Sequence, residues 1–160
     1  MFEIRVESEF SAAHFLRDYN GKCENLHGHN YKVFVHVCGK ELDGGGMLID
    51  FALLKSALKD VLFELDHTNL NDNPAFDQNP SAERIAVYIY EKLTAVLRAR
   101  GVNLPESTDE INESNNKKVC PPESKNKSGA RNGKESALPD IKITAIDIYE
   151  TPTSRARYIP

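Results

Sequence analysis

Residues 23–39 read Cys-Glu-Asn-Leu-His-Gly-His-Asn-Tyr-Lys-Val-Phe-Val-His-Val-Cys-Gly, and the interpretation of the whole chain starts from this stretch. Apolar side chains at every second position predict a strand over about 28–39. Alternate side chains of a strand share a face, so His27 and His29 would lie side by side. Two imidazoles at that spacing can reach one metal ion.

An earlier strand supplies a third histidine. Apolar and polar side chains alternate strictly over residues 2–13, which predicts a strand with one buried face. His14 follows in step with the apolar set and is expected on the protected side. Three neutral imidazoles with an open fourth position are typical of a catalytic zinc site rather than a structural one. The sequence therefore predicts that His14, His27 and His29 bind Zn²⁺.

Other polar residues near this pattern have both a functional and a plain interpretation. The Cys23 thiol could transfer protons beside the metal, could be a fourth ligand, or could be buried and inert. Asp66 could orient His67 for proton transfer, or His67 could simply interact with a helix dipole. Glu150 could accept two N–H bonds from a guanidine-like ring edge, or could be a solvated strand end.

Two helices are expected in the middle of the chain. Asp50 can cap a helix that ends near residues 66–67 and buries a stripe formed by Phe51, Leu54, Leu58, Leu62 and Leu65. A second helix is expected to have Asn79 as its cap and Pro80 at its first position, and to end at Gly101. His36 and Cys38 point away from the histidine pair along their strand, and we assign them to packing.

The rest of the chain completes the predicted fold. Strands are expected at 140–150 and 154–159, whereas residues 102–139 have the composition of a disordered insertion, in which Cys120 would have no role. The order of elements indicates a single α+β domain over 1–160: a four-stranded antiparallel sheet with two helices on one face. Its two open edges would be hidden in a homo-oligomer.

Composition narrows the function classes. The 160 residues are 40% hydrophobic and 28% charged, with a net charge of -4 and no basic patches, so no nucleic-acid partner is expected. No apolar run approaches the roughly 20 residues of a membrane span, and the first residues do not resemble a signal peptide. Three cysteines without a disulfide pattern suit a reducing, cytoplasmic setting.

Together these residues resemble the family of 6-pyruvoyl-tetrahydropterin synthase and 6-carboxy-tetrahydropterin synthase, the latter known as QueD. The resemblance covers residues 1–101 and 140–159. Its motifs are His14, Cys23 with His27-Gly28-His29, Asp50-Phe51, Leu65-Asp66-His67, Pro80-Ser81-Ala82-Glu83 and Glu150-Thr151-Pro152.

The resemblance implies a fold, an assembly and roles for residues. The fold is the tunnelling fold (T-fold), whose sheets join edge to edge into barrel-like homo-oligomers, usually hexamers. The three histidines would bind zinc, and Glu150 would anchor a pterin ring. A proton-transfer triad, with some members from a neighbouring subunit, would be formed by Cys23, Asp66 and His67.

The implied QueD reaction converts 7,8-dihydroneopterin triphosphate to 6-carboxy-5,6,7,8-tetrahydropterin, a queuosine precursor, with release of acetaldehyde and triphosphate. In one branch of the family a glutamate three residues before the first histidine replaces the cysteine as base, and the product is 6-hydroxymethyl-7,8-dihydropterin for folate synthesis. Glu24 matches that glutamate, so the chain carries both candidate bases, like members able to do both reactions.

Further alternatives stay open. A noncatalytic pterin-binding homologue is one. The mammalian-type synthase for tetrahydrobiopterin is another, but it generally has more residues between the cysteine and the first histidine than the three found here. Candidates for contact with a triphosphate are Arg17, Lys22 and Arg155.

Overall fold

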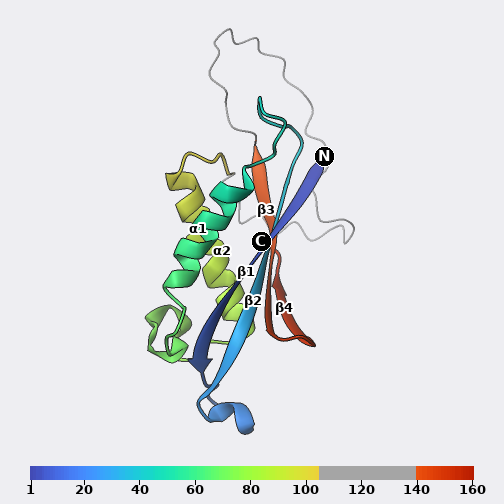
Figure 1. Ribbon diagram of the computed structural model, residues 1–160. Coiled ribbons are helices and arrows are strands. Elements are labelled where there is room, and N and C mark those ends of the chain that lie inside the picture. Colours follow the sequence, from blue (N-terminus) through green and yellow to red (C-terminus); the bar gives the residue numbers. More distant parts are fainter. Residues whose placement is uncertain (105–139) are drawn as a thin grey trace.

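The computed structural model describes residues 1–104 and 140–160. Four strands form one antiparallel sheet in sequence order (Figure 1), namely β1 (Phe2–His14), β2 (His27–Gly39), β3 (Ile141–Thr151) and β4 (Ser154–Tyr158). The helices α1 (Phe51–Phe63) and α2 (Ala82–Ala99) lie together on one face of this sheet. The predicted α+β arrangement is confirmed.

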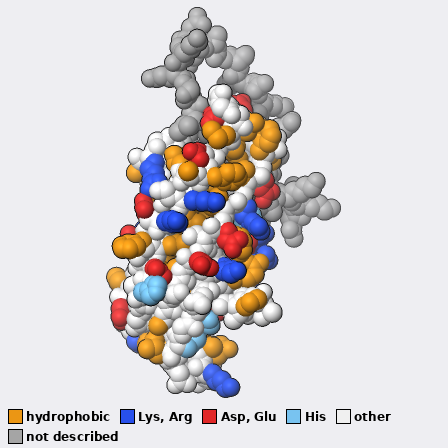
Figure 2. Space-filling view, viewed as in Figure 1, with side chains coloured by type: hydrophobic (Ala, Val, Ile, Leu, Met, Phe, Trp, Pro, Cys, Tyr) orange, Lys and Arg blue, Asp and Glu red, His pale blue; other side chains and the backbone are white. Residues whose placement is uncertain are grey.

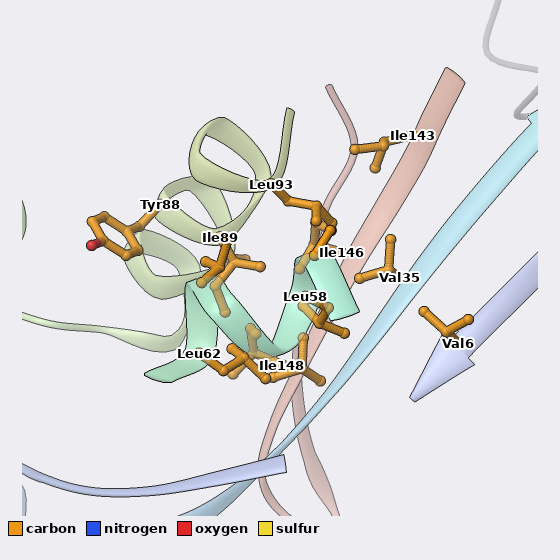
Figure 3. Close-up of a cluster of buried hydrophobic side chains, with 14 of the residues drawn as sticks. Val6, Val35, Leu58, Leu62, Tyr88, Ile89, Leu93, Ile143, Ile146 and Ile148 are labelled. Carbon is orange, nitrogen blue, oxygen red and sulfur yellow. The ribbon is translucent and has the colours of Figure 1, made fainter. Parts of the chain in front are cut away.

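The core lies between the helices and the sheet. Alternation along the strands sends one set of side chains toward the helices, and the apolar stripes of the helices meet that set. Figure 3 shows this contact, with labelled contributions from Val35, Leu58, Leu62, Ile89, Leu93, Ile146 and Ile148. Each such side chain, when fully buried, contributes roughly 1.5–3 kcal/mol to stability. No helix among residues 1–104 and 140–160 is long and apolar enough to cross a membrane.

The pairing of β1 with β2 positions the three histidines. From Phe2 to His14, every residue of β1 faces one residue of β2 without interruption. The ladder ends with His14 opposite His27, and Ala12 opposite His29. The three histidines therefore come together at one end of the sheet.

The first helix begins as predicted and ends earlier. The Asp50 carboxylate accepts a 2.7 Å hydrogen bond from the backbone N–H of Ala52, which confirms the cap. The helix ends at Phe63, before the expected 66–67. Leu65 lies beyond the helix but is still buried, whereas Phe51 is half exposed, contrary to the prediction.

The predicted start of the second helix is wrong by two residues. Ser81, not Asn79, is the cap, and Pro80 lies outside the helix. The expected cap groups are engaged elsewhere, because the Asn79 side chain accepts a hydrogen bond from the Arg17 N–H and the Pro80 carbonyl accepts one from His14. The start of α2 is thus set by contacts with the β1 end.

The start predicted for the disordered insertion, residue 102, is too early in the chain. Val102 and Leu104 are buried and belong to the core, and the Ile141 N–H donates to the Asn103 carbonyl at 3.3 Å. Residues 102–104 therefore pack beside the start of β3. The remainder of the expected insertion, with Cys120, lies outside the described residues.

A polar network links the four strands. Asp147 of β3 is buried on the face away from the helices, and the Arg157 guanidinium donates to its two oxygens at 2.6 and 2.7 Å. His36 lies 3.0 Å from the same carboxylate and 3.5 Å from a Glu3 oxygen. Cys38 is buried as predicted, but the assignment of His36 to packing is incomplete, because it bridges carboxylates on two other strands.

We expect Asp147→Asn to lower the free energy of unfolding by about 1–3 kcal/mol at pH 7, since it removes the negative charge and one of the two oxygens that accept from Arg157. Burial alone would raise the pKa of Asp147, but hydrogen bonds from Arg157 and His36 outweigh burial and hold that pKa below its ordinary value. A carboxylate with a lowered pKa stabilises the fold above about pH 4 and stops doing so as the pH falls further.

Urea midpoints of wild type and Asp147→Asn should therefore differ at pH 7 and converge as the pH falls below 4. The matched control is Glu9→Gln, which neutralises an exposed carboxylate on β1 and should not change the midpoint. An equal effect of the two variants would contradict the role of the network.

Candidate functional site

The three predicted metal ligands converge. The ring centroids lie 4.6 Å apart for His14 and His27, 5.2 Å for His14 and His29, and 4.9 Å for His27 and His29. One ligand nitrogen from each ring lies within 4.8 Å of the other two. Among the described residues no other group of this kind is found, and Cys23 is not a member of it.

Backbone carbonyls set which nitrogen of two rings faces the centre of the triad. Nδ1 of His14 lies 2.9 Å from the Pro80 carbonyl, and Nδ1 of His27 lies 2.8 Å from the Asn25 carbonyl. A carbonyl only accepts, so both Nδ1 atoms donate, and in the neutral form of each ring Nε2 then keeps a lone pair. Nε2 of His14 is buried and has no hydrogen-bond partner within the described chain.

The surroundings keep His14 neutral, as a metal ligand must be. Burial lowers the pKa of His14, and this effect exceeds the opposing effect of its bond to Pro80. The ring of Tyr31 stacks on Phe10 at 4.7 Å and meets the edges of His14 and His29 at 5.9 and 5.5 Å. Imidazole nitrogens that converge beside these aromatic rings fit a divalent metal ion such as zinc.

Asp66 and His67 form a hydrogen-bonded pair at the outer edge of β1. His67 Nδ1 lies 2.9 Å from an Asp66 oxygen, and the other Asp66 oxygen accepts a 2.8 Å bond from the Ser11 N–H. The Ser11 and His67 bonds lower the pKa of Asp66 and keep it charged. The His67 backbone is left-handed, with φ of 57°, and its ring is 81% exposed. Asp66 can therefore orient an imidazole that is open to a substrate.

Two cavities meet at the start of β2. One, of about 550 Å³, is lined by His67 and residues 28–30. The other, of about 650 Å³, is lined by the same residues 28–30 together with Glu150, Phe34 and Tyr149. In Figure 2 histidine side chains reach the surface at this lower end of the molecule. His67 and Glu150 thus flank the histidine strand from the β1 side and the β3 side.

Glu150 also lies close to the triad. One of its oxygens is 3.9 Å from His14 Nε2, and its side chain is 26% exposed. A carboxylate in this position can accept two N–H bonds from a flat heterocycle while the side chain of that heterocycle extends toward the metal. Arg155, a predicted triphosphate contact, lines a smaller cavity of about 250 Å³ beside Glu150.

Cys23 and Glu24 lie on the loop that leads into β2, in the short 3-10 helix η1 (Lys22–Glu24). Cys23 is half-buried, and its carbonyl accepts a 2.8 Å bond from the Leu16 N–H. Glu24 is turned back onto its own loop and accepts bonds from the Tyr19 and Asn20 N–H groups. Neither residue lines the two larger cavities.

Sequence reasoning missed the groups that orient the predicted residues. These are mostly backbone atoms, namely the carbonyls of Asn25 and Pro80 and the N–H of Ser11, for which no side-chain pattern exists. Asn71 is different, because its buried amide bonds both backbone groups of Phe15. An asparagine among turn residues gives no signal for such a contact.

Comparisons with known proteins give the family and the fold of the chain. The model of the 6-pyruvoyl tetrahydropterin synthase family matches residues 3–119. The chain belongs to this family. The solved structure of 6-pyruvoyl tetrahydropterin synthase from Caenorhabditis elegans has a TM-score of 0.65 and 25% identity, covering 99% of this chain and 95% of that one. The predicted T-fold is thereby confirmed for the chain.

Bacterial family members of another name also match. The 6-carboxy-5,6,7,8-tetrahydropterin synthase of Bacillus subtilis is 41% identical over 102 residues, 60% of this chain and 68% of that protein. The protein of the same name from Haemophilus influenzae is 31% identical over 162 residues, 99% of each chain.

We expect His29→Ala to lower zinc affinity by more than the roughly 10–100-fold lost when a residue that only orients a ligand is removed. The measurement is zinc content by mass spectrometry after purification, with competition against a chelator. His67→Ala is the matched control, since that ring lies outside the triad and should leave the metal content unchanged. Equal zinc in both variants would contradict the assignment of the ligands.

Proposed function

We propose that this family member is a zinc-dependent 6-carboxy-5,6,7,8-tetrahydropterin synthase. It would convert 7,8-dihydroneopterin triphosphate to 6-carboxytetrahydropterin, acetaldehyde and triphosphate, within queuosine precursor synthesis in the cytoplasm. The observation that carries the proposal is the convergence of three imidazoles between an Asp66–His67 pair and Glu150.

The triad would hold the metal. His14 and His27 present Nε2, and His29 completes the set. Zinc bound there would supply a Lewis acid that lowers the energy of negative charge developing on the substrate side chain.

The remaining residues would bind the substrate and move protons. Glu150 would accept two N–H bonds from the pterin edge and so aim the C6 side chain at the triad. The Asp66 carboxylate holds Nδ1–H of His67, which leaves Nε2 to take or give a proton. The Cys23 thiol would transfer a proton at the opposite side of the substrate side chain.

The choice among the reactions of the family rests on two supports. The Bacillus subtilis and Haemophilus influenzae relatives both carry the 6-carboxy name. Only three residues separate Cys23 from His27, fewer than in the mammalian-type pattern. Retention of Cys23, Asp66, His67 and Glu150 speaks against a noncatalytic pterin-binding protein.

Assembly would complete the site. The order of strands leaves β1 and β4 at the two edges of the sheet, and their pairing with further copies would give a barrel, most simply a hexamer. Cys23 does not line the cavity that contains His67 in one chain. We therefore propose that these two residues act together across a subunit boundary.

We expect Cys23→Ala to keep its zinc and to lose turnover by roughly 100-fold or more, the size of a proton-transfer contribution. Incubation with dihydroneopterin triphosphate and mass spectrometry of the released pterin gives both the rate and the product. A hydroxymethyl product that disappears in Glu24→Ala would favour the alternative reaction with Glu24 as base. Loss of zinc in Cys23→Ala would make the thiol a ligand and contradict the mechanism.

A mixture of two inactive variants tests the shared site. In mixed oligomers of Cys23→Ala and His67→Ala, roughly a quarter of the sites would combine an intact thiol with an intact imidazole from different chains. Co-expression with two affinity tags should therefore restore about a quarter of wild-type turnover. Each variant alone is the control, and no recovery in the mixture would place both residues of a site on one chain.

A further inference from the structure

The loop between β1 and β2 is fixed at its start. The Asn71 side chain accepts from the Phe15 N–H at 2.9 Å and donates to the Phe15 carbonyl at 2.8 Å. The Asn79 side chain accepts from the Arg17 N–H at 3.2 Å. The chain therefore enters the loop in a defined direction.

The middle of the loop has an unusual backbone. Asp18 and Asn20 are left-handed, with φ of 58° and 56°, a conformation that asparagine and aspartate tolerate better than most residues. Gly21 follows beneath the ring of Tyr19, and a Cβ at this glycine would lie 2.7 Å from that ring. This conformation turns the N–H groups of residues 19 and 20 toward one point.

Glu24 occupies that point. One carboxylate oxygen accepts from the Tyr19 N–H at 3.1 Å and from the Asn20 N–H at 3.0 Å. Hydrogen bonds to a charged acceptor are stronger than those between neutral groups. The Glu24 carboxylate thus links the end of the 18–24 segment to its beginning.

Cys23 belongs to the segment whose backbone these hydrogen bonds hold. Its carbonyl accepts from the Leu16 N–H at 2.8 Å, and the Glu24 N–H donates to the Gly21 carbonyl at 3.1 Å. The backbone of Cys23 is therefore held in a loop whose start is bound by Asn71 and whose middle is bound by Glu24. We expect the position of the thiol to depend on both.

We infer that Glu24 is a positioning residue, which fixes the 18–24 loop and thereby the Cys23 thiol, and is not the base of the reaction. A base must bring a carboxylate oxygen to the substrate, whereas the two backbone bonds to Oε1 hold this carboxylate against its own loop. The inference deepens the proposed function and rests on it for the role of Cys23. The reaction would then depend on the cysteine, with the carboxy product.

Glutamine separates the two roles of Glu24. Glu24→Gln keeps an oxygen that can accept both N–H bonds but cannot act as a base, whereas Glu24→Ala removes both functions. Asn20→Val disturbs the loop without changing Glu24, because a β-branched residue is strained at positive φ. Glu41→Ala, which removes an exposed carboxylate from a different loop, is the matched control.

Three measurements are made on the full chain with its metal. These are hydrogen exchange of residues 17–25, the rate of alkylation of Cys23 followed by peptide mass spectrometry, and kcat and KM with dihydroneopterin triphosphate. In Glu24→Ala and Asn20→Val we expect exchange to accelerate at least about 10-fold, the alkylation rate to change, and kcat to fall more than KM rises. Glu24→Gln should stay within about fivefold of wild type in all three, and Glu41→Ala should match wild type.

Two outcomes would overturn the inference. One is loss of turnover in Glu24→Gln with exchange and alkylation unchanged, which would make Glu24 the base. The other is unchanged alkylation and turnover in Glu24→Ala despite faster exchange. If wild type itself turns over no pterin, the proposed function fails, whereas exchange and alkylation still decide whether Glu24 positions Cys23.

Discussion

Thirteen residues of β1 face thirteen residues of β2, and this pairing places His14 opposite His27 at the last rung of the ladder. Successive residues of a strand point to opposite faces, so a slip of one position would turn the side chains of β1 to the other face. The alternation that buries Val6 and Phe10 is therefore the same alternation that aims His14 at its partners. Burial of these apolar side chains fixes the register of β1 with β2, and this register fixes the positions of the three histidines.

The arrangement of His14 lowers the stability of the folded chain when no ligand is bound. His14 Nε2 is buried without a hydrogen-bond partner, and a buried polar atom in that state costs about 1–3 kcal/mol. Its other nitrogen cannot turn to relieve this, because it is bound to the Pro80 carbonyl. A ligand on Nε2 would remove the penalty, so metal binding would stabilise the fold as well as serve catalysis. The same bond to His14 holds Pro80 just before Ser81, the cap of α2, which explains why that helix begins at Ala82 and not at Pro80.

The strands, the faces of the sheet and the convergence of the histidines could be predicted from the sequence, because each depends on local alternation and parity. The predictions that were wrong concern residues whose environment is set by tertiary contacts rather than by their local sequence. Asn79 is a good cap by type, yet its side chain is used by the loop after β1. Val102 and Leu104 are isolated apolar residues in a polar context, and only the fold shows that the core has room for them. The link from His36 to Asp147 joins residues 111 positions apart, and no local pattern reveals it.

The proposed assembly would account for the arrangement of Glu150, His67 and Cys23 around the triad, because one chain would then make only part of a site. Glu150 and His67 flank the start of β2 from opposite sides, and each opens onto its own cavity. Cys23 is held on a loop beyond the end of the sheet. In the proposed oligomer another copy would bring its own set of these groups to the same place, and the combined set could surround one small substrate. The outer edges of β1 and β4 offer backbone groups for such an approach, except at residues 11–13 of β1, which already bond to residues 66–69. The hydrogen bonds that hold the β1–β2 loop would then matter twice, since the loop would present the Cys23 thiol to a metal in its own chain and to an imidazole from a neighbour.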